Sequence, residues 1–138
     1  MASKVDDRGY NQGFENSYAT DLRLERRADY MISLMDNPSN KTILEIGAGT
    51  GELAYLLASK TKAKTLSTDL CVPFIEEARK NFPLENLKFE VLDFNKATDF
   101  TNQKFDYIVG NGILHHLYFH LDAALENILK LLNENGKM

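Results

Sequence analysis

The fold of this chain is decided by the stretch Ile43-Leu44-Glu45-Ile46-Gly47-Ala48-Gly49-Thr50-Gly51. Its first part is apolar apart from one acid, and its second part alternates glycine with small residues. An apolar strand that runs directly into such a loop and then into a helix brings backbone amides to the carboxyl edge of a parallel sheet, where ligands of open α/β folds bind. Glycine suits both the tight turn and a close ligand, because it has no Cβ atom. Three alternating glycines favour this interpretation over an ordinary turn.

Outward from this stretch, short apolar runs alternate with segments of helical periodicity. This alternation is typical of parallel sheets built from strand-helix-strand units, and it predicts an α/β, Rossmann-like, doubly wound fold. The predicted strands are 42–46, 64–68, 87–92 and 105–109, and the predicted helices are 52–59, 73–81 and 121–132.

The region before the first strand divides into two parts. In residues 21–35, apolar side chains recur at helical spacing between charged ones, which predicts an amphipathic helix. Residues 1–20 are polar with interspersed aromatics and have no clear periodicity. We therefore expect a flexible arm over residues 1–20 and one ligand-binding domain over residues 21–138.

Composition limits the classes of function. With 138 residues, 43% of them hydrophobic and 26% charged, the chain has the balance of one globular domain. Its net charge of −4 and scattered lysines argue against a nucleic-acid partner. The single cysteine, Cys71, and the absence of a Cys/His cluster argue against a metal site. No signal peptide or membrane-spanning segment is visible, so we expect a cytoplasmic protein.

The glycine spacing separates two classes of cofactor. A dinucleotide site requires Gly-x-Gly-x-x-Gly/Ala, whereas position 52 here is Glu52 and the third glycine comes one residue early. An acid, Glu45, stands two residues before the first glycine. This arrangement, together with Asp69, Asp93 and residues 105–117, resembles the seven-stranded S-adenosylmethionine-dependent methyltransferases, in their small-molecule branch.

The resemblance covers most of the chain after Lys41, and it implies a cofactor, a reaction and a strand order of 3-2-1-4. The cofactor is S-adenosylmethionine, which becomes S-adenosylhomocysteine when its methyl group is transferred to a small molecule. The loop residues Gly47, Ala48, Gly49 and Gly51 are then expected beside the methionine part of the cofactor. In the family, the acid at the position of Glu45 helps to organise the site near the cofactor's amino group, where a carboxylate favours a nearby ammonium.

Asp69 ends the second predicted strand, about 20 residues after the first glycine, where an acid can accept hydrogen bonds from ribose hydroxyls. The alternative is a helix N-cap, for which aspartate is also suited. We favour the ribose role, and we expect Leu70 against the adenine ring.

Asp93 follows the third predicted strand, where the family pattern has an acid that accepts a hydrogen bond from the adenine amino group. Phe94 is then expected to flank the ring. A turn-forming aspartate is the alternative. The order of glycine loop, Asp69 and Asp93 along the chain favours the binding role.

The fourth predicted strand leads into Gly110-Asn111-Gly112-Ile113-Leu114-His115-His116-Leu117, which resembles motif IV of the family. The resemblance implies that the carbonyls around Gly110 and Asn111 face the cofactor's amino group. The Asn/Asp-Pro-Pro-Tyr/Phe signature of enzymes that methylate nucleic-acid bases is absent, so base methylation is disfavoured.

His115 and His116 are the candidate catalytic bases, because histidine titrates in the range useful for removing a proton from an acceptor hydroxyl. The alternative is that one histidine packs under the next helix while the other faces solvent or caps the turn. Sequence adjacency does not distinguish these possibilities.

Two further candidates precede the glycine loop. Aromatic residues of the arm, Tyr18 among them, are candidates for a lid over the cofactor. Arginines of the first predicted helix, foremost Arg23, are candidates to pair with the cofactor's carboxylate, although exposure to solvent is the simpler interpretation for each.

The C-terminal sequence predicts an incomplete sheet. Asn135-Gly136 has the composition of a left-handed turn after a helix, and the family's strands 5–7 are expected to be missing. The exposed edge of the fourth strand would then require a partner or an oligomer to cover it. Truncation is the preferred explanation. An enzyme is the main hypothesis, and a non-catalytic cofactor-binding subunit or inactive fragment is the alternative.

Overall fold

The computed structural model of the chain describes residues 18–94, 103–113 and 121–138, and the backbone alone for residues 18–20. Five parallel strands form one sheet with the order β3-β2-β1-β4-β5. The strands are β1 (Thr42–Ile46), β2 (Lys64–Asp69), β3 (Leu87–Val91), β4 (Phe105–Gly110) and β5 (Leu132–Lys137). The predicted Rossmann-like α/β fold and the order 3-2-1-4 of the first four strands are confirmed.

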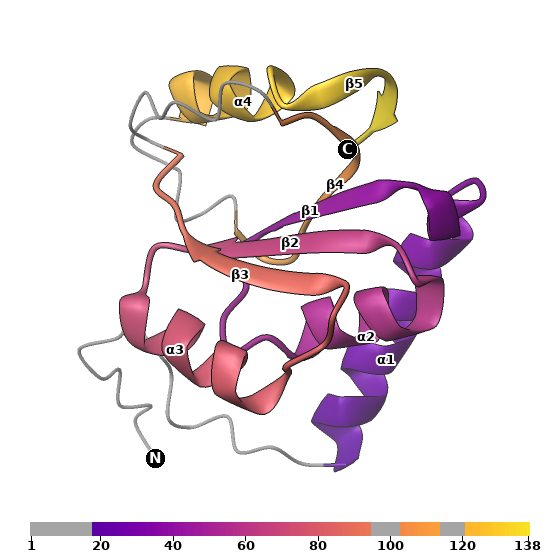
Figure 1. The fold of residues 1–138 in the computed structure, drawn as a ribbon, viewed down its shortest axis with the longest axis vertical. Helices are drawn as coiled ribbons and strands as arrows, with labels where there is room; N and C mark the ends of the chain where they lie inside the picture. Colours follow the sequence, from indigo (N-terminus) through magenta and orange to yellow (C-terminus); the bar gives the residue numbers. More distant parts are fainter. Residues whose placement is uncertain (1–17, 95–102, 114–120) are drawn as a thin grey trace.

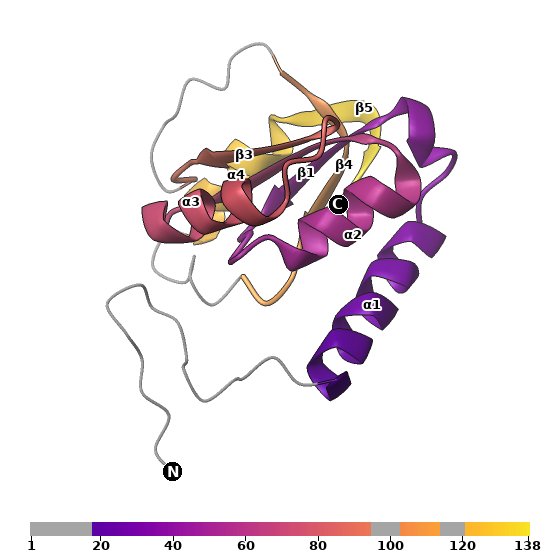
Figure 2. The same ribbon diagram turned by 60° about the horizontal axis from the view of Figure 1, so that its bottom comes forward.

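Helices cover both faces of this sheet (Figure 1). They are α1 (Tyr18–Ser33), the short 3-10 helix η1 (Pro38–Asn40), α2 (Glu52–Thr61), α3 (Val72–Asn81) and α4 (Leu121–Leu129). The first three α-helices lie on one face and α4 lies on the other, as Figure 2 also shows. The molecule therefore has three layers, with β1 in the centre of the middle layer.

The core follows from the alternation of side chains along β1, because successive residues of a strand point to opposite faces. Leu44 packs in the cluster that contains Ile108 and Ile128 of α4. Ile43 packs on the opposite face with Tyr107. Since both faces of a parallel sheet are covered, the strand reads as an almost continuous apolar run.

The C-terminal prediction is wrong in one respect. The helix expected to reach residue 132 ends at Leu129, and residues Leu132–Lys137 form β5 beside β4. The fifth strand, expected to be missing, is therefore present. Gly136 lies within it and is not among the glycines with positive φ. Apolar spacing alone does not separate a last helical turn from an edge strand, and pairing with β4 decides between them.

The outer edge of β4 is only partly covered by β5. Phe105 pairs with Leu132 and Tyr107 pairs with Lys137, so β5 is irregular between these two positions. The Asn133 side chain reinforces the contact by donating to Asp106 Oδ1 at 2.9 Å. The expectation of a bare fourth-strand edge is thus wrong for the first half of β4.

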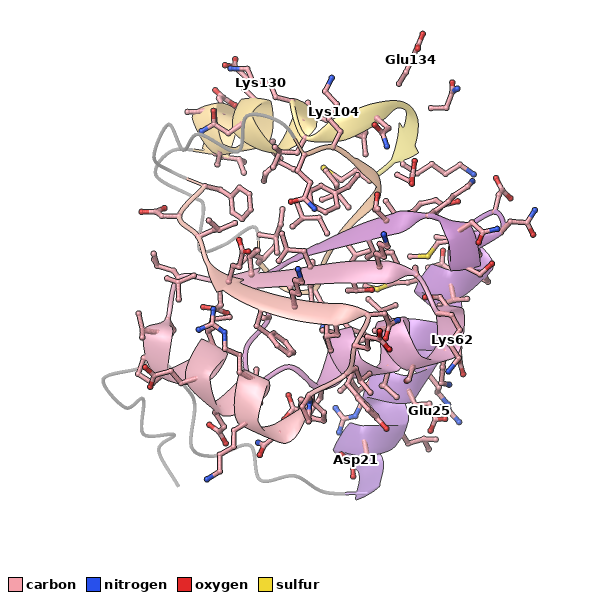
Figure 3. All side chains as sticks on the ribbon, viewed as in Figure 1. Asp21, Glu25, Lys62, Lys104, Lys130 and Glu134 are labelled. Carbon is pink, nitrogen blue, oxygen red and sulfur yellow. The ribbon has the colours of Figure 1, made fainter. Side chains whose placement is uncertain are left out.

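Charged side chains project from both outer layers. Figure 3 shows Asp21 and Glu25 on the side of α1, and Lys130 and Glu134 on the side of α4 and β5. Across the described ranges, no helix is long and apolar enough to cross a membrane. The same residues contain no group of three or more metal-ligating side chains that could hold an ion.

Candidate functional site

The glycine loop is fixed to the end of β2 by three backbone amides. The amides of Gly47 and Ala48 both donate to the Thr68 carbonyl, each at 2.8 Å. The Gly49 amide donates to Asp69 Oδ2 at 2.9 Å. The loop and the last two residues of β2 therefore form one unit at the carboxyl edge of the sheet.

Asp69 is not the N-cap of the following helix, which was the alternative predicted for it. Its Oδ1 accepts a hydrogen bond from the Cys71 amide at 2.9 Å. Cys71 is itself the N-cap of α3, and that position has no side-chain capping bond. Each carboxylate oxygen can accept a further hydrogen bond. Asp69 thus fixes two backbone segments and retains capacity for hydroxyl donors at the edge.

Two glycines of the loop are required for different reasons. Gly49 has φ +54, and among the described residues, its two chain neighbours apart, no atom lies within 4 Å of the position that its Cβ would take. Gly51 has φ +97, and a Cβ there would lie 2.9 Å from the Ala78 Cβ atom and 3.0 Å from the Phe89 ring. Gly49 therefore leaves open space beside the loop, whereas Gly51 allows α2 to pack closely against α3 and β3.

Glu45 lies beneath the edge and is 1% exposed. Its carboxyl accepts a hydrogen bond from Ser67 Oγ at 2.5 Å, across the register pair that joins β1 to β2. Burial raises the pKa of Glu45 to about 8; the Ser67 hydrogen bond opposes the shift, and the charges of Asp69 and Glu52 add to it. Glu45 therefore carries its proton at neutral pH. Ser67 was missed by the sequence analysis, because β2 has the mostly polar sequence KTLSTD, which does not single out this serine.

The end of β4 meets the glycine loop through Ile113. A Cβ at Gly47 would lie 2.8 Å from Ile113 Cδ1, and a Cβ at Gly110 would lie 2.8 Å from Ile113 Cγ2. One aliphatic side chain thus covers both glycines, which belong to motifs far apart in the sequence. Ile113 was quoted in motif IV but was not predicted as a site residue.

Asn111 contacts α1 through an arginine other than the predicted one. Arg27 Nη1 donates to Asn111 Oδ1 at 3.4 Å. Arg23 is exposed one turn earlier on the same helix. The helix is fixed against α2 because Lys60 pairs with Glu25 at 3.3 Å and with Asp29 at 2.7 Å. Arg23 and Arg27 are four residues apart, so both lie on one face of the helix. This spacing could have identified Arg27 as a candidate from the sequence.

The residues predicted near adenine separate into two groups. Leu70 is 62% exposed next to Asp69, and Asp93 is half-buried after β3. Phe94, by contrast, is 4% exposed and packs in the core cluster of α4 with Ile108. The structure therefore assigns its ring to the core.

Several predicted residues lie outside the described part of the chain. These are His115, His116 and the arm up to residue 17; for Tyr18, the backbone begins α1 but the side chain is not described.

In the described part of the edge, a carboxylate with acceptor capacity, Asp69, lies beside the space at Gly49, an arrangement that can accept hydrogen bonds from hydroxyl groups. Residues 37–138 match the model of a protein family described as "Methyltransferase domain". This chain belongs to that family. The predicted resemblance to the seven-stranded S-adenosylmethionine-dependent methyltransferases is confirmed.

One relative in sequence and two solved structures illustrate what this chain is similar to. Malonyl-[acyl-carrier protein] O-methyltransferase of Acetivibrio thermocellus is 30% identical over 103 residues, which are 74% of this chain and 35% of that protein. The PH0226 protein of Pyrococcus horikoshii OT3 has a TM-score of 0.73 at 21% identity, over 96% of this chain and 58% of that one. Coclaurine N-methyltransferase bound to N-methylheliamine and S-adenosylhomocysteine has a TM-score of 0.66 at 15% identity, over 92% and 37%. The chain thus spans less than two thirds of each.

Proposed function

We propose that this chain is the cofactor-binding part of a methyltransferase that acts on a small-molecule acceptor. The family and a structural neighbour that holds S-adenosylhomocysteine indicate S-adenosylmethionine as the cofactor. The observation that carries the proposal is the space that the described residues leave at Gly49, whose amide is bonded to Asp69, at the edge where ligands of open α/β sheets bind.

Asp69 would hold the ribose, because its carboxylate faces the loop amide of Gly49 and each of its oxygens has acceptor capacity left. The exposed side chain of Leu70 would lie against adenine, which matches an apolar ring to an apolar surface. Asp93 would accept a hydrogen bond from the adenine amino group.

The amino-acid end of the cofactor would lie between the loop and the end of β4. The carbonyls of Gly110 and Asn111 are acceptors for its ammonium. Arg27 is a better candidate than Arg23 for its carboxylate, because Arg27 already contacts Asn111. The buried side chain of Glu45 would support this end of the cofactor from beneath the sheet edge, through its hydrogen bond with Ser67.

Bound S-adenosylmethionine supplies an electrophilic methyl group on a sulfonium. The protein's task is then to hold an acceptor in line with that methyl group and to exclude water. If the acceptor is a hydroxyl, a base is needed, and His116 or His115 after β4 would serve. Tyr18, at the start of α1, and the aromatic residues that precede it would close the site.

A small acceptor is supported by the relative whose name gives malonyl-[acyl-carrier protein] as its substrate. The net charge of −4 also disfavours a nucleic-acid acceptor. The alternative is a cofactor-binding subunit without turnover, which a methyl-transfer assay distinguishes from an enzyme.

Calorimetric titration with S-adenosylmethionine, S-adenosylhomocysteine and NAD tests the proposal. We expect both sulfur compounds to bind and NAD not to bind. Binding of NAD alone would overturn the proposal. A methyl-transfer screen with radiolabelled cofactor then distinguishes an enzyme from a silent binder.

A further inference from the structure

Thr68, the second-last residue of β2, holds the segment that joins β1 to the glycine loop. Its hydroxyl donates to the Glu45 carbonyl at 2.8 Å. Its own carbonyl accepts from the amides of Gly47 and Ala48, each at 2.8 Å. Thr68 therefore makes hydrogen bonds on both sides of Ile46, its register partner on β1.

The Thr68 side chain is 0% exposed, so it does not itself reach a ligand at the sheet edge. Because side chains alternate along a strand, it lies on the same face as Leu66, which packs against the core cluster that contains Ile128 of α4. The neighbouring Ser67 lies on the opposite face and donates to the Glu45 carboxyl. Any effect of Thr68 on a ligand must therefore pass through the residues that it holds.

The start of the loop needs such support. Gly47 has φ +82, and glycine adopts positive and negative φ about equally readily, so the residue does not fix this conformation by itself. A loop that moves freely loses conformational entropy when a ligand binds, and that loss lowers affinity. Hydrogen bonds that hold the loop before the ligand arrives reduce the loss.

We propose that Thr68 is a positioning residue, which holds the glycine loop in its binding conformation before the cofactor arrives. Its hydroxyl fixes the end of β1, its carbonyl fixes the first residues of the loop, and Asp69 holds Gly49 from the next position. The inference rests on the proposed function and goes beyond it, because it gives a buried residue outside the ligand contacts a part in cofactor affinity.

Three substitutions isolate the Thr68 hydroxyl. Thr68→Val removes the hydroxyl and keeps the branched shape, whereas Thr68→Ser keeps the hydroxyl. Thr65→Val is the matched control, because Thr65 is a buried threonine of the same strand whose hydroxyl donates to the Ala63 carbonyl at 3.2 Å. That bond lies at the other end of β2, away from the glycine loop.

Calorimetric titration with S-adenosylhomocysteine measures the affinity of each variant. Loss of one such hydrogen bond changes an equilibrium about three- to tenfold, so we expect Thr68→Val to weaken binding by about that factor. Thr68→Ser and Thr65→Val should bind as the unmodified protein does. Unchanged affinity in Thr68→Val, or a loss of the same size in Thr68→Ser or Thr65→Val, would overturn the inference.

Hydrogen exchange of the free protein, followed by NMR, tests the loop without a ligand. The amides of Gly47 and Ala48 should exchange about three- to tenfold faster in Thr68→Val than in the unmodified protein or in Thr65→Val, because a loosened loop opens more often. Equal exchange in all three proteins would overturn the inference. If the unmodified protein bound neither sulfur compound, the proposed function would fail, yet exchange would still decide whether Thr68 holds the loop.

Discussion

The Asp69 carboxylate accepts a hydrogen bond from the Gly49 amide, with 2.9 Å between Oδ2 and the nitrogen. This bond joins the end of β2 to the loop after β1. The residue proposed to hold the ribose therefore also fixes the loop that would contact the methionine part. Substitution of Asp69 should disturb both parts of the site together.

Asp69→Asn and Asp69→Ala should weaken S-adenosylhomocysteine binding to different degrees. Asparagine keeps one oxygen that can accept from Gly49 or Cys71, whereas alanine keeps none. Since a hydrogen bond to a charged group contributes about 1.5–3 kcal/mol, we expect losses of about tenfold and about a hundredfold. Calorimetry measures both. Glu76→Gln, an exposed acid on α3, is the control, and normal binding by Asp69→Ala would contradict the role.

Alanine at Gly51 should mainly lower stability, whereas alanine at Gly49 should mainly weaken cofactor binding. Gly51→Ala overpacks the contact with Ala78 and should lower the free energy of unfolding by about 2–4 kcal/mol. Gly49→Ala meets no atom of the described residues beyond its chain neighbours and should cost only its backbone strain, about 1–2 kcal/mol, but its new methyl group enters the proposed ligand space. Urea unfolding and calorimetry measure the two quantities. Equal effects of both variants on affinity would contradict the assignment.

Glu45 should make the protein less stable as pH rises. Its pKa is about 8 in the folded chain and close to the ordinary value of 4.5 when unfolded. Between these values the folded state binds more protons, so stability present below pH 4.5 is lost as pH rises through about 8. Urea unfolding at several pH values checks this. Glu45→Gln should remove this part of the decline, and an identical slope in both proteins would disprove the cause.

Arg27→Gln should weaken S-adenosylhomocysteine binding about tenfold, because a charge-assisted hydrogen bond to the ligand carboxylate is lost. Binding of 5′-methylthioadenosine, which lacks the amino-acid end, should not change. Arg26→Gln, an exposed neighbour on α1, should affect neither ligand. If Arg27→Gln weakens both ligands equally, the arginine acts on the fold rather than on the carboxylate.

His116→Ala should lower turnover about a hundredfold or more while leaving cofactor affinity nearly unchanged, because a general base acts only in the chemical step. His115→Ala distinguishes the two candidates, and His120→Ala is the control. Methyl transfer from radiolabelled cofactor measures turnover, and calorimetry measures affinity. An equal loss of both quantities in His116→Ala would remove it from the role of base.

The sequence predicted the elements of this fold whose signals are local. The alternation of strands and helices and the glycine loop follow from side-chain periodicity and from the absence of Cβ atoms, which neighbouring residues display directly. The strand order of β1 to β4 followed from the family resemblance. The end of α4 was mispredicted because Leu132 continues the helical spacing, yet residues 132–137 gain backbone partners only next to β4.

The sequence by itself thus determined the fold class, the family and the loop at which a cofactor would bind. Only the tertiary structure decided that Ser67 supports Glu45, that Arg27 contacts Asn111, and that Phe94 lies in the core. The physical reason is sequence distance. Arg27 and Asn111 are 84 residues apart, and no local pattern reports which side chains the packing of α1 brings to the end of β4.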